Sequence, residues 1–300
     1  MLRGAAVRGE IVSLDASWGE IVQRHDLPPS VRDRLGELAA AALLLSATLK
    51  FDGKLILQIH GDGPVTLFVV ECDVSGSFRA TVKLRDGVDI APGADLAALV
   101  NVHGRGRFVV TLDPSSKSSG RQAYQGIVPF EGRSVAEVLE RYMQRSEQIP
   151  TRLWLAANGQ RAAGLLLQRL PTDGGHQPAV ERRAAPDEDG WNRLGKLAET
   201  LSESEMLHLS SGSVLKRLFW QESLHAFDER ACQFSCSCNR EKVSAMLRML
   251  GKCEIDLLLV ERGDVEVHCD FCNQPYCFDA VDCAALFSST LGPPTSAVQH

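Results

Sequence analysis

Four cysteines in two close pairs are the residues of this chain best suited to chemistry. Cys236 and Cys238 form the first pair, Cys269 and Cys272 form the second, and thirty residues separate the pairs. Two such pairs can bring four sulfurs to the corners of one tetrahedron, because each pair supplies two corners and the loop between them fixes their separation. Zinc is the ion that favours four thiolates in this geometry. Four sulfurs leave no open position, so we expect a closed site that does not activate water.

The other cysteines indicate the compartment. Eight of the nine lie between Cys232 and Cys283, and Cys72 stands apart. An odd, clustered set is unlike a secreted disulfide framework, so we expect a reducing compartment, where clustered cysteines indicate metal or redox chemistry. Residues 1–10 have no apolar stretch typical of a secretory signal, and no apolar run reaches the ~18 residues of a membrane span. We therefore expect a cytoplasmic protein without a membrane partner.

Charge and motif content bear on two other function classes. The formal net charge is −6, and residues 228–283 hold eleven acidic and six basic side chains, which disfavours nucleic acid as a partner. The chain has no nucleotide-binding glycine loop, no P-loop and no His-Glu-x-x-His motif, so we expect no enzyme. Two alternatives stay open at this point: a zinc ribbon that binds nucleic acid, and thiol–disulfide exchange through Cys269 and Cys272, which would need an exposed pair in a thioredoxin-like context.

The chain before the cysteine cluster predicts an α+β domain over residues 1–172. A helix that begins at Pro28-Pro29-Ser30, with Ser30 as its N-cap, has apolar residues at helical spacing. Ser134 and Glu137 predict a capping box at the start of a second helix. Gly61-Asp62-Gly63-Pro64 between two apolar runs predicts a hairpin. The predicted strands form a largely antiparallel sheet with helices packed on it and cover residues 7–14, the two arms of 54–71, 78–84, 107–112, 123–130, 151–157 and 162–170.

Composition changes after this domain. Residues 173–227 predict a linker, in which a Pro-, Gly- and charge-rich stretch precedes two or three short amphipathic helices over 191–220. Helices this short are not stable alone, so their apolar faces must pack on another surface, which we take to be the N-terminal sheet. The rest of the chain predicts a small zinc-binding domain over 228–285, with a helix at 241–250 and strands at 265–268 and 276–278, and a flexible tail over 286–300.

Six short blocks follow one another along nearly the whole chain. They are Ala6-Val7-Arg8-Gly9-Glu10, Ala47-Thr48-Leu49-Lys50-Phe51-Asp52-Gly53, Gly61-Asp62-Gly63-Pro64, Arg145-Ser146-Glu147-Gln148-Ile149-Pro150-Thr151-Arg152, Cys236-Ser237-Cys238 and His268-Cys269-Asp270-Phe271-Cys272. Each block is weak alone, but their order and the gap between the cysteine pairs make the set specific. In these blocks the chain resembles the 33-kilodalton redox-regulated heat-shock chaperone family, bacterial holdases that work without ATP.

The resemblance implies a ligand set, a switch and a partner. Cys236, Cys238, Cys269 and Cys272 would bind one zinc ion per chain as thiolates in the reduced, inactive form. On oxidation, Cys236 would pair with Cys238 and Cys269 with Cys272, zinc would leave, and the chaperone would become active on unfolded or aggregation-prone proteins. A homodimer of the oxidised form is a further expectation. The apolar residues that we expect to be uncovered for client binding are Leu194, Leu197, Leu201, Leu215, Leu218 and Phe219.

The chemistry of sulfur agrees with such a switch. Zinc has no redox states of its own, so a redox response must reside in the sulfurs, and zinc keeps them as the thiolates that oxidants attack. A Cys-x-Cys disulfide must bridge Cα atoms roughly 6–7 Å apart, which is near the upper limit of good geometry. A strained bond of this kind is readily reduced, as a reversible switch requires.

Plainer interpretations stand beside these. The four cysteines could hold a purely structural zinc ion that never leaves. His268 is expected to pack or hydrogen-bond near the sulfurs rather than bind zinc, and Cys72 is expected in the core. The apolar stripe of 191–220 could be core-facing helix and nothing more. Four additional thiols are Cys232, Cys253, Cys277 and Cys283. We expect them to be small apolar core residues or exposed residues without a role, although they widen the choice of disulfide partners.

Overall fold

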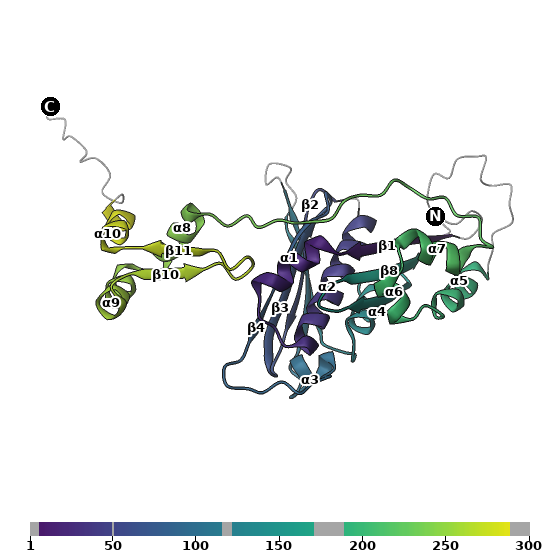
Figure 1. Cartoon of the computed structure of the whole chain (residues 1–300), viewed down its shortest axis with the longest axis horizontal. Helices are drawn as coiled ribbons and strands as arrows, with labels where there is room; N and C mark the ends of the chain where they lie inside the picture. Colours follow the sequence, from purple (N-terminus) through teal and green to yellow (C-terminus); the bar gives the residue numbers. More distant parts are fainter. Residues whose placement is uncertain (1–5, 50, 116–121, 171–188, 289–300) are drawn as a thin grey trace, which may run out of the picture. The chain divides into compact units, whose positions relative to one another are not determined.

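A computed structural model describes residues 6–49, 51–115, 122–170 and 189–288 (Figure 1). The chain divides into two compact units, Met1–Ser235 and Cys236–His300, called here the N-terminal and C-terminal units. The early part of the predicted linker and residues 289–300 of the predicted tail lie outside the described residues, whereas 286–288 still belong to a helix. Within the described part of the chain, no helix has the length and apolar character needed to cross a membrane.

The N-terminal unit contains two sheets where the sequence predicted one. The larger sheet has the strand order β6-β5-β2-β3-β4-β9 and the smaller sheet the order β1-β8-β7. All neighbours are antiparallel except β4 and β9, so the α+β class and the largely antiparallel character are confirmed. The strands are β1 (Val7–Leu14), β2 (Gly53–His60), β3 (Val65–Asp73), β4 (Ser77–Leu84), β5 (Arg107–Pro114), β6 (Tyr124–Pro129), β7 (Thr151–Ala157), β8 (Ala162–Arg169) and β9 (Gln233–Phe234).

Helix α2 (Pro29–Thr48) forms the centre of the main core. Its residues from Leu35 to Ser46 are buried on every side, because the helix contacts strands of both sheets. A helix that is apolar all round belongs in such an interior. The prediction that Ser30 is the N-cap is wrong. The N-cap is Pro28, and the helix begins at Pro29, whose fixed φ and missing N–H suit the first helical turn.

Three further helices complete this part of the N-terminal unit. Helix α4 (Val135–Arg145) begins after Ser134, whose side chain accepts a hydrogen bond from the Glu137 backbone N–H. The apolar residues at helical spacing along it, Val135, Val138, Leu139, Tyr142 and Met143, are all buried. Helices α1 (Ala16–Arg24) and α3 (Leu96–Val100) were not predicted from the sequence.

Three short helices of the predicted linker cover the smaller sheet: α5 (Gly190–Ala198), α6 (Glu203–His208) and α7 (Ser211–Phe219). Their apolar side chains form one cluster with Val7, Leu165 and Leu167 of β1 and β8, and Figure 1 shows the three helices beside these strands. Ser202 and Glu205 form the predicted capping box at the start of α6. The prediction that short helices bury their apolar faces on the N-terminal sheets is therefore confirmed.

The C-terminal unit is a small hairpin with three helices. Its elements are α8 (Arg240–Leu250), α9 (Lys252–Arg262), β10 (Val265–His268), β11 (Pro275–Phe278) and α10 (Ala280–Ser288). The sequence predicted α8, β10 and β11 but neither α9 nor α10. The fully or nearly buried apolar residues of the unit are Val243, Leu247, Ile255, Val265, Phe278, Cys283 and Leu286.

Candidate functional site

The four predicted cysteine sulfurs meet in the C-terminal unit. The Sγ atoms of Cys236, Cys238, Cys269 and Cys272 all lie within 4.8 Å of one another. Cys236 Sγ is 3.7 Å from Cys269 Sγ, and Cys238 Sγ is 3.3 Å from Cys272 Sγ. The cluster is thus positioned to hold a metal ion.

Local structure on each side fixes the two pairs. The first pair immediately precedes α8, where the Asn239 side chain accepts from the Lys242 backbone N–H at 2.8 Å and Lys242 Nζ donates to the Ser237 carbonyl at 2.5 Å. The second pair lies in the turn between β10 and β11. There the Cys269 N–H donates to Gln274 O at 3.0 Å, and the Asn273 N–H donates to Cys269 O at 2.8 Å. Asn273 has a left-handed φ of 57°, which closes this turn tightly.

The sulfur separations fit zinc. With a Zn–S bond of about 2.3 Å, a tetrahedral site has sulfur–sulfur edges of about 3.8 Å. The two measured separations, 3.3 and 3.7 Å, are near this edge and far from the ~2.05 Å of a disulfide bond. None of the nine cysteines, all of which the structure describes, forms a disulfide bond. The donor set of four sulfurs is also one that zinc prefers.

The electrostatics of the cluster favour a bound cation. Burial raises the pKa of Cys238, but hydrogen bonds from Tyr276 and from the neighbouring cysteines outweigh burial and bring this pKa down to about 7. Burial raises the pKa of Cys269 and of Cys272. Four thiolates this close repel one another, and a divalent cation among them relieves the repulsion.

Tyr276 is a member of this site that the sequence did not identify. Its Oη donates to Cys238 Sγ at 3.1 Å. The hydrogen bond to Cys238 raises the pKa of Tyr276 to about 12, so the phenol stays protonated as the donor. Arg240, the first residue of α8, contacts the neighbouring strand rather than the four cysteines: it donates to the Cys277 carbonyl at 2.8 Å, and its guanidinium carbon lies 4.1 Å from the centre of the Phe278 ring.

His268 and the remaining cysteines lie outside the group of four. The ring nitrogens of His268 are engaged with Asn273 Oδ1 at 3.2 Å and Glu266 Oε1 at 2.9 Å. Cys72 is buried in β3, as expected, and Cys283 is buried in the small core. Cys253 and Cys277 are exposed, and Cys232 is partly buried.

The six residues predicted for client binding lie together on the smaller sheet of the N-terminal unit. Leu194, Leu201, Leu218 and Phe219 are buried, and Leu197 and Leu215 are partly buried against the same cluster. The linker helices α5, α6 and α7 therefore conceal both these side chains and the sheet face beneath them.

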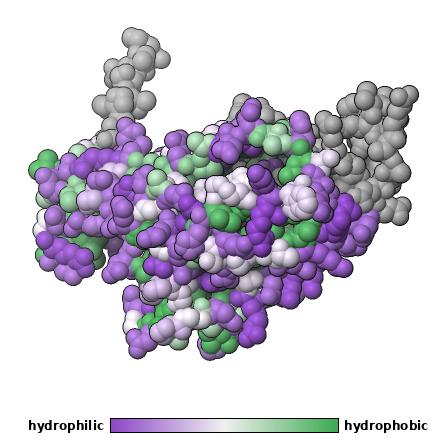
Figure 2. All heavy atoms as spheres, turned by 45° about the vertical axis from the view of Figure 1, so that its right-hand side comes forward, coloured by the Kyte–Doolittle hydropathy of each residue, from purple (hydrophilic) through white to green (hydrophobic). Residues whose placement is uncertain are grey.

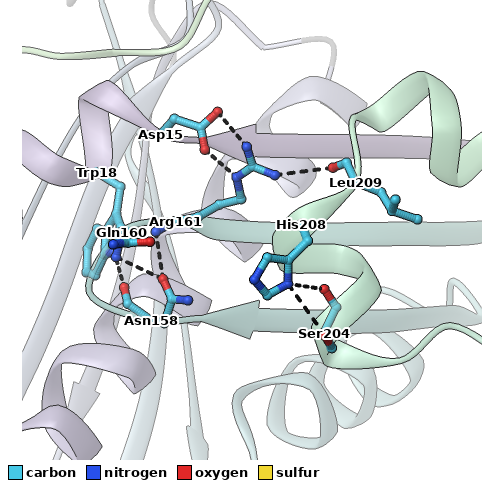
Figure 3. Close-up of polar contacts among 8 residues, drawn as sticks. All are labelled: Asp15, Trp18, Asn158, Gln160, Arg161, Ser204, His208 and Leu209. Carbon is cyan, nitrogen blue, oxygen red and sulfur yellow. Dashed lines mark hydrogen bonds and ion pairs between the residues drawn. The ribbon is translucent and has the colours of Figure 1, made fainter.

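Two arginines fasten the linker helices to the smaller sheet. Arg161, in the turn before β8, pairs with Asp15 through two nitrogens and donates to the Leu209 carbonyl at the end of α6 at 3.2 Å (Figure 3). Arg152 of β7 pairs with Glu199 at 3.1 Å, and its guanidinium carbon lies 5.5 Å from the Trp191 ring centre. Neither arginine's contacts have a local signal in the sequence, because they join residues at least 39 positions apart.

Comparisons with known proteins all point to one protein family. A family model described as "Hsp33 protein" matches residues 1–279. The chain is similar to the 33 kDa chaperonin of Methylobacillus flagellatus, with 45% identity over 100% of this chain and 97% of that protein. It is also similar to the 33 kDa chaperonin of Chromobacterium violaceum, with 45% identity over 95% and 90% of the two chains.

A solved structure shares the fold. The crystal structure of the 33 kDa chaperonin (heat shock protein 33 homolog) of Thermotoga maritima matches with a TM-score of 0.75 and 24% identity. The match covers 95% of this chain and 94% of that chain.

Proposed function

Because this chain belongs to the Hsp33 family, we propose that it is a redox-regulated chaperone that holds unfolding proteins without ATP. The redox part of this proposal is supported by the position of the four cysteine sulfurs, which all lie within 4.8 Å of one another. Reduced sulfurs at these distances can hold a cation, and oxidised sulfurs cannot. The oxidation state of these four cysteines would therefore decide whether the C-terminal unit keeps its bound cation.

The four cysteines would hold one zinc ion per chain in the reduced protein. When bound, zinc keeps the sulfurs deprotonated at neutral pH, and thiolates are the form that oxidants attack. Tyr276 supports the centre because its hydroxyl donates a hydrogen bond to Cys238 Sγ, which orients that sulfur and lowers its pKa.

Oxidation joins the sulfurs in disulfide bonds, so that they no longer bind the cation as thiolates. Each disulfide forms as two thiolates give up one electron each, and one hydrogen peroxide takes up these two electrons and two protons from the solvent to become two waters. We propose the pairs Cys236–Cys238 and Cys269–Cys272. The close approaches in the reduced centre, 236 to 269 and 238 to 272, cross between the pairs. The proposed pairing rests instead on the short loops within each pair, which give neighbours the highest effective concentration once the centre opens.

Loss of the cation is expected to unfold the C-terminal unit. Its core comprises seven buried apolar residues, including one cysteine, and such a small core depends on its metal for stability. The linker helices precede this unit in the chain and have nine, six and nine residues, which is too short for independent stability. Their release would uncover the cluster around Leu194, Leu201 and Leu218.

The partners of this surface would be unfolded or aggregation-prone proteins of the cytoplasm. On the face seen in Figure 2, hydrophilic residues dominate and hydrophobic residues form separate patches, and the six residues proposed for client binding are buried or partly buried. The chaperone proposal includes a homodimer of the oxidised form. It includes neither an enzymatic activity nor a nucleic-acid partner. The Cys269–Cys272 pair lies in a β-hairpin turn, not in the βαβ context of thiol–disulfide exchange proteins.

The test joins zinc content to chaperone activity in one sample. Aggregation of a heat-denatured client is followed by light scattering with reduced protein and with protein treated with peroxide under mild heat. We expect suppression of aggregation only by the oxidised, zinc-free protein, and peptide mapping of that sample should find the two proposed disulfides. Equal suppression by the reduced, zinc-loaded protein would refute redox regulation.

A further inference from the structure

Residues 230–235, called here the strap, lie along the outer edge of the larger sheet in the N-terminal unit. The strap contains β9, which pairs with β4 in parallel, Ser77 opposite Gln233 and Phe78 opposite Phe234. The Gln233 N–H donates to Gly76 O at 3.0 Å, and the Ser235 N–H donates to Phe78 O at 2.9 Å. The strap thus pairs with the first two residues of the outer β4 edge and occupies backbone groups there.

The edge is shaped to accept this backbone closely. Gly76 has a φ of +88°, and a Cβ at this position would lie only 2.5 Å from the Ala231 carbonyl oxygen. Arg230 donates to the Val74 carbonyl at 3.2 Å, and Gln233 Nε2 donates to Ser77 Oγ at 3.3 Å. Only a glycine turn permits this approach, because a side chain there would displace the strap.

One aromatic side chain anchors the strap. Phe234 packs against the main core, and the guanidinium carbon of Arg24 lies 4.9 Å from the centre of its ring. The site therefore combines two backbone acceptors, Gly76 O and Phe78 O, with an apolar position for the Phe234 ring. The Arg24 guanidinium lies over this ring. Recognition of an extended strand by backbone hydrogen bonds, with one side chain in a pocket, is the mode of β-strand addition.

The strap is also the segment that oxidation would release first. It ends one residue before Cys236, and its strand is only two residues long. A strand this short is held by the folded chain on both sides and opens readily when one side unfolds. Its departure would leave the β4 edge and the position of the Phe234 ring free.

We propose that this edge of β4 is a strand-docking site, closed by the strap in the reduced protein and occupied in the oxidised protein by an extended client segment with an aromatic side chain. The proposal rests on the proposed function, since clients are its occupants. Backbone hydrogen bonds do not depend on sequence, so such a site accepts many unfolded chains while excluding folded ones.

The probe that tests the site is a fluorescent peptide, Glu-Arg-Ala-Ser-Gln-Phe-Ser, which copies residues 229–235 with serine in place of the cysteine. Its control has alanine in place of the phenylalanine. In fluorescence anisotropy, oxidised full-length protein should bind the phenylalanine peptide about tenfold tighter than the control, because only the phenylalanine peptide can bury a ring at the site. Reduced protein should bind neither peptide.

Two variants separate this proposal from the proposed function. Reduced Phe234→Ala protein should bind the probe without oxidation, because its strap has lost the anchor. Reduced Phe227→Ala protein should not, since Phe227 is 72% exposed. A probe with a benzophenone in place of the ring should crosslink to α1 or β4. If oxidised protein suppresses aggregation yet binds both peptides equally, or crosslinks the probe only to the smaller sheet, the docking site is wrong while the chaperone function stands.

Discussion

At the residue scale, Cys238 differs from its three partners because a phenol hydroxyl donates to its sulfur. The spacing of the four cysteines is a local signal, so the sequence alone could predict the set that the structure brings together. The role of Tyr276 could not be predicted in this way. It depends on the register of β10 with β11, in which Val267 lies opposite Tyr276, and this register turns the phenol toward a sulfur 38 positions earlier in the chain.

Removal of a single thiolate should cost the protein its zinc. We expect Cys236→Ser and Cys272→Ser proteins to purify without stoichiometric zinc, because such a centre contributes on the order of 10 kcal/mol through four ligands that act together. Cys253→Ser and Cys277→Ser, which alter exposed thiols outside the cluster, should retain one zinc per chain. Zinc content by mass spectrometry of the intact protein checks this. Tightly held zinc in both of the first two variants would show that the ligand set is different.

Loss of the Tyr276 hydroxyl should weaken zinc binding without abolishing it. Tyr276→Phe removes the donor to Cys238 Sγ, and supporting hydrogen bonds of this kind contribute roughly tenfold or more to metal affinity. Competition with a chromogenic chelator measures the affinity. The matched control is Tyr124→Phe, which changes a tyrosine on the half-exposed edge of β6. Equal affinities in Tyr276→Phe and the control would remove Tyr276 from the site.

At the element scale, helical periodicity and capping residues predicted α5, α6 and α7 but did not predict α9. Helices α5, α6 and α7 alternate buried and exposed residues, and capping by Ser202 and Ser210 marks two starts. Helix α9 buries only Ile255 and leaves Val260 88% exposed, so its apolar residues follow no helical face. Strand β9 has two residues and pairs with a strand about 150 positions away, which leaves no local pattern to read.

The Arg161 contact should set how firmly the linker helices are held. Arg161→Ala removes the pair with Asp15 and the hydrogen bond to Leu209 O, and hydrogen bonds involving charged groups contribute about 1.5–3 kcal/mol each. In reduced protein we expect faster hydrogen exchange across α6 and α7, with α2 unchanged. Arg145→Ala, which breaks an exposed pair with Glu131, is the control. Unaltered exchange in α6 and α7 would show that the apolar cluster alone holds these helices.

Glu37 should make the N-terminal unit less stable as pH rises. Burial raises the pKa of this α2 carboxyl to about 7, despite the attraction of Arg34, whose guanidinium nitrogen is 2.8 Å away. Because the unfolded state releases this proton near pH 4.5 and the folded state near pH 7, the free energy of unfolding should fall by roughly 3 kcal/mol between these values. Above pH 7 the contribution of Glu37 is constant.

Urea unfolding of reduced protein at pH 5 and pH 8 measures this difference. Glu37→Gln, which keeps the size of the side chain but cannot ionise, should flatten the dependence. A Glu37→Gln protein with the same fall in stability as the parent would show that another group is responsible.

At the scale of the whole molecule, the two units differ in how they are stabilised. The N-terminal unit has a large core around α2, whereas the C-terminal unit combines seven buried apolar residues with a four-sulfur centre. The order of these parts could be predicted from changes in composition along the chain. That the linker helices pack on a separate three-stranded sheet could not, because it depends on which strands pair far apart in sequence, as β1 does with β8.

In the proposed mechanism, oxidation of the four cysteines unfolds the C-terminal unit and the linker while the N-terminal core stays folded. Limited proteolysis, followed by mass spectrometry on the same peroxide-treated sample that suppresses aggregation, tests it most directly. We expect cleavage to increase strongly across residues 175–285 and to stay low across 1–170, relative to reduced, zinc-loaded protein. Unchanged cleavage across 175–285 in active, zinc-free protein would refute oxidation-driven unfolding as the mechanism, even with chaperone activity confirmed.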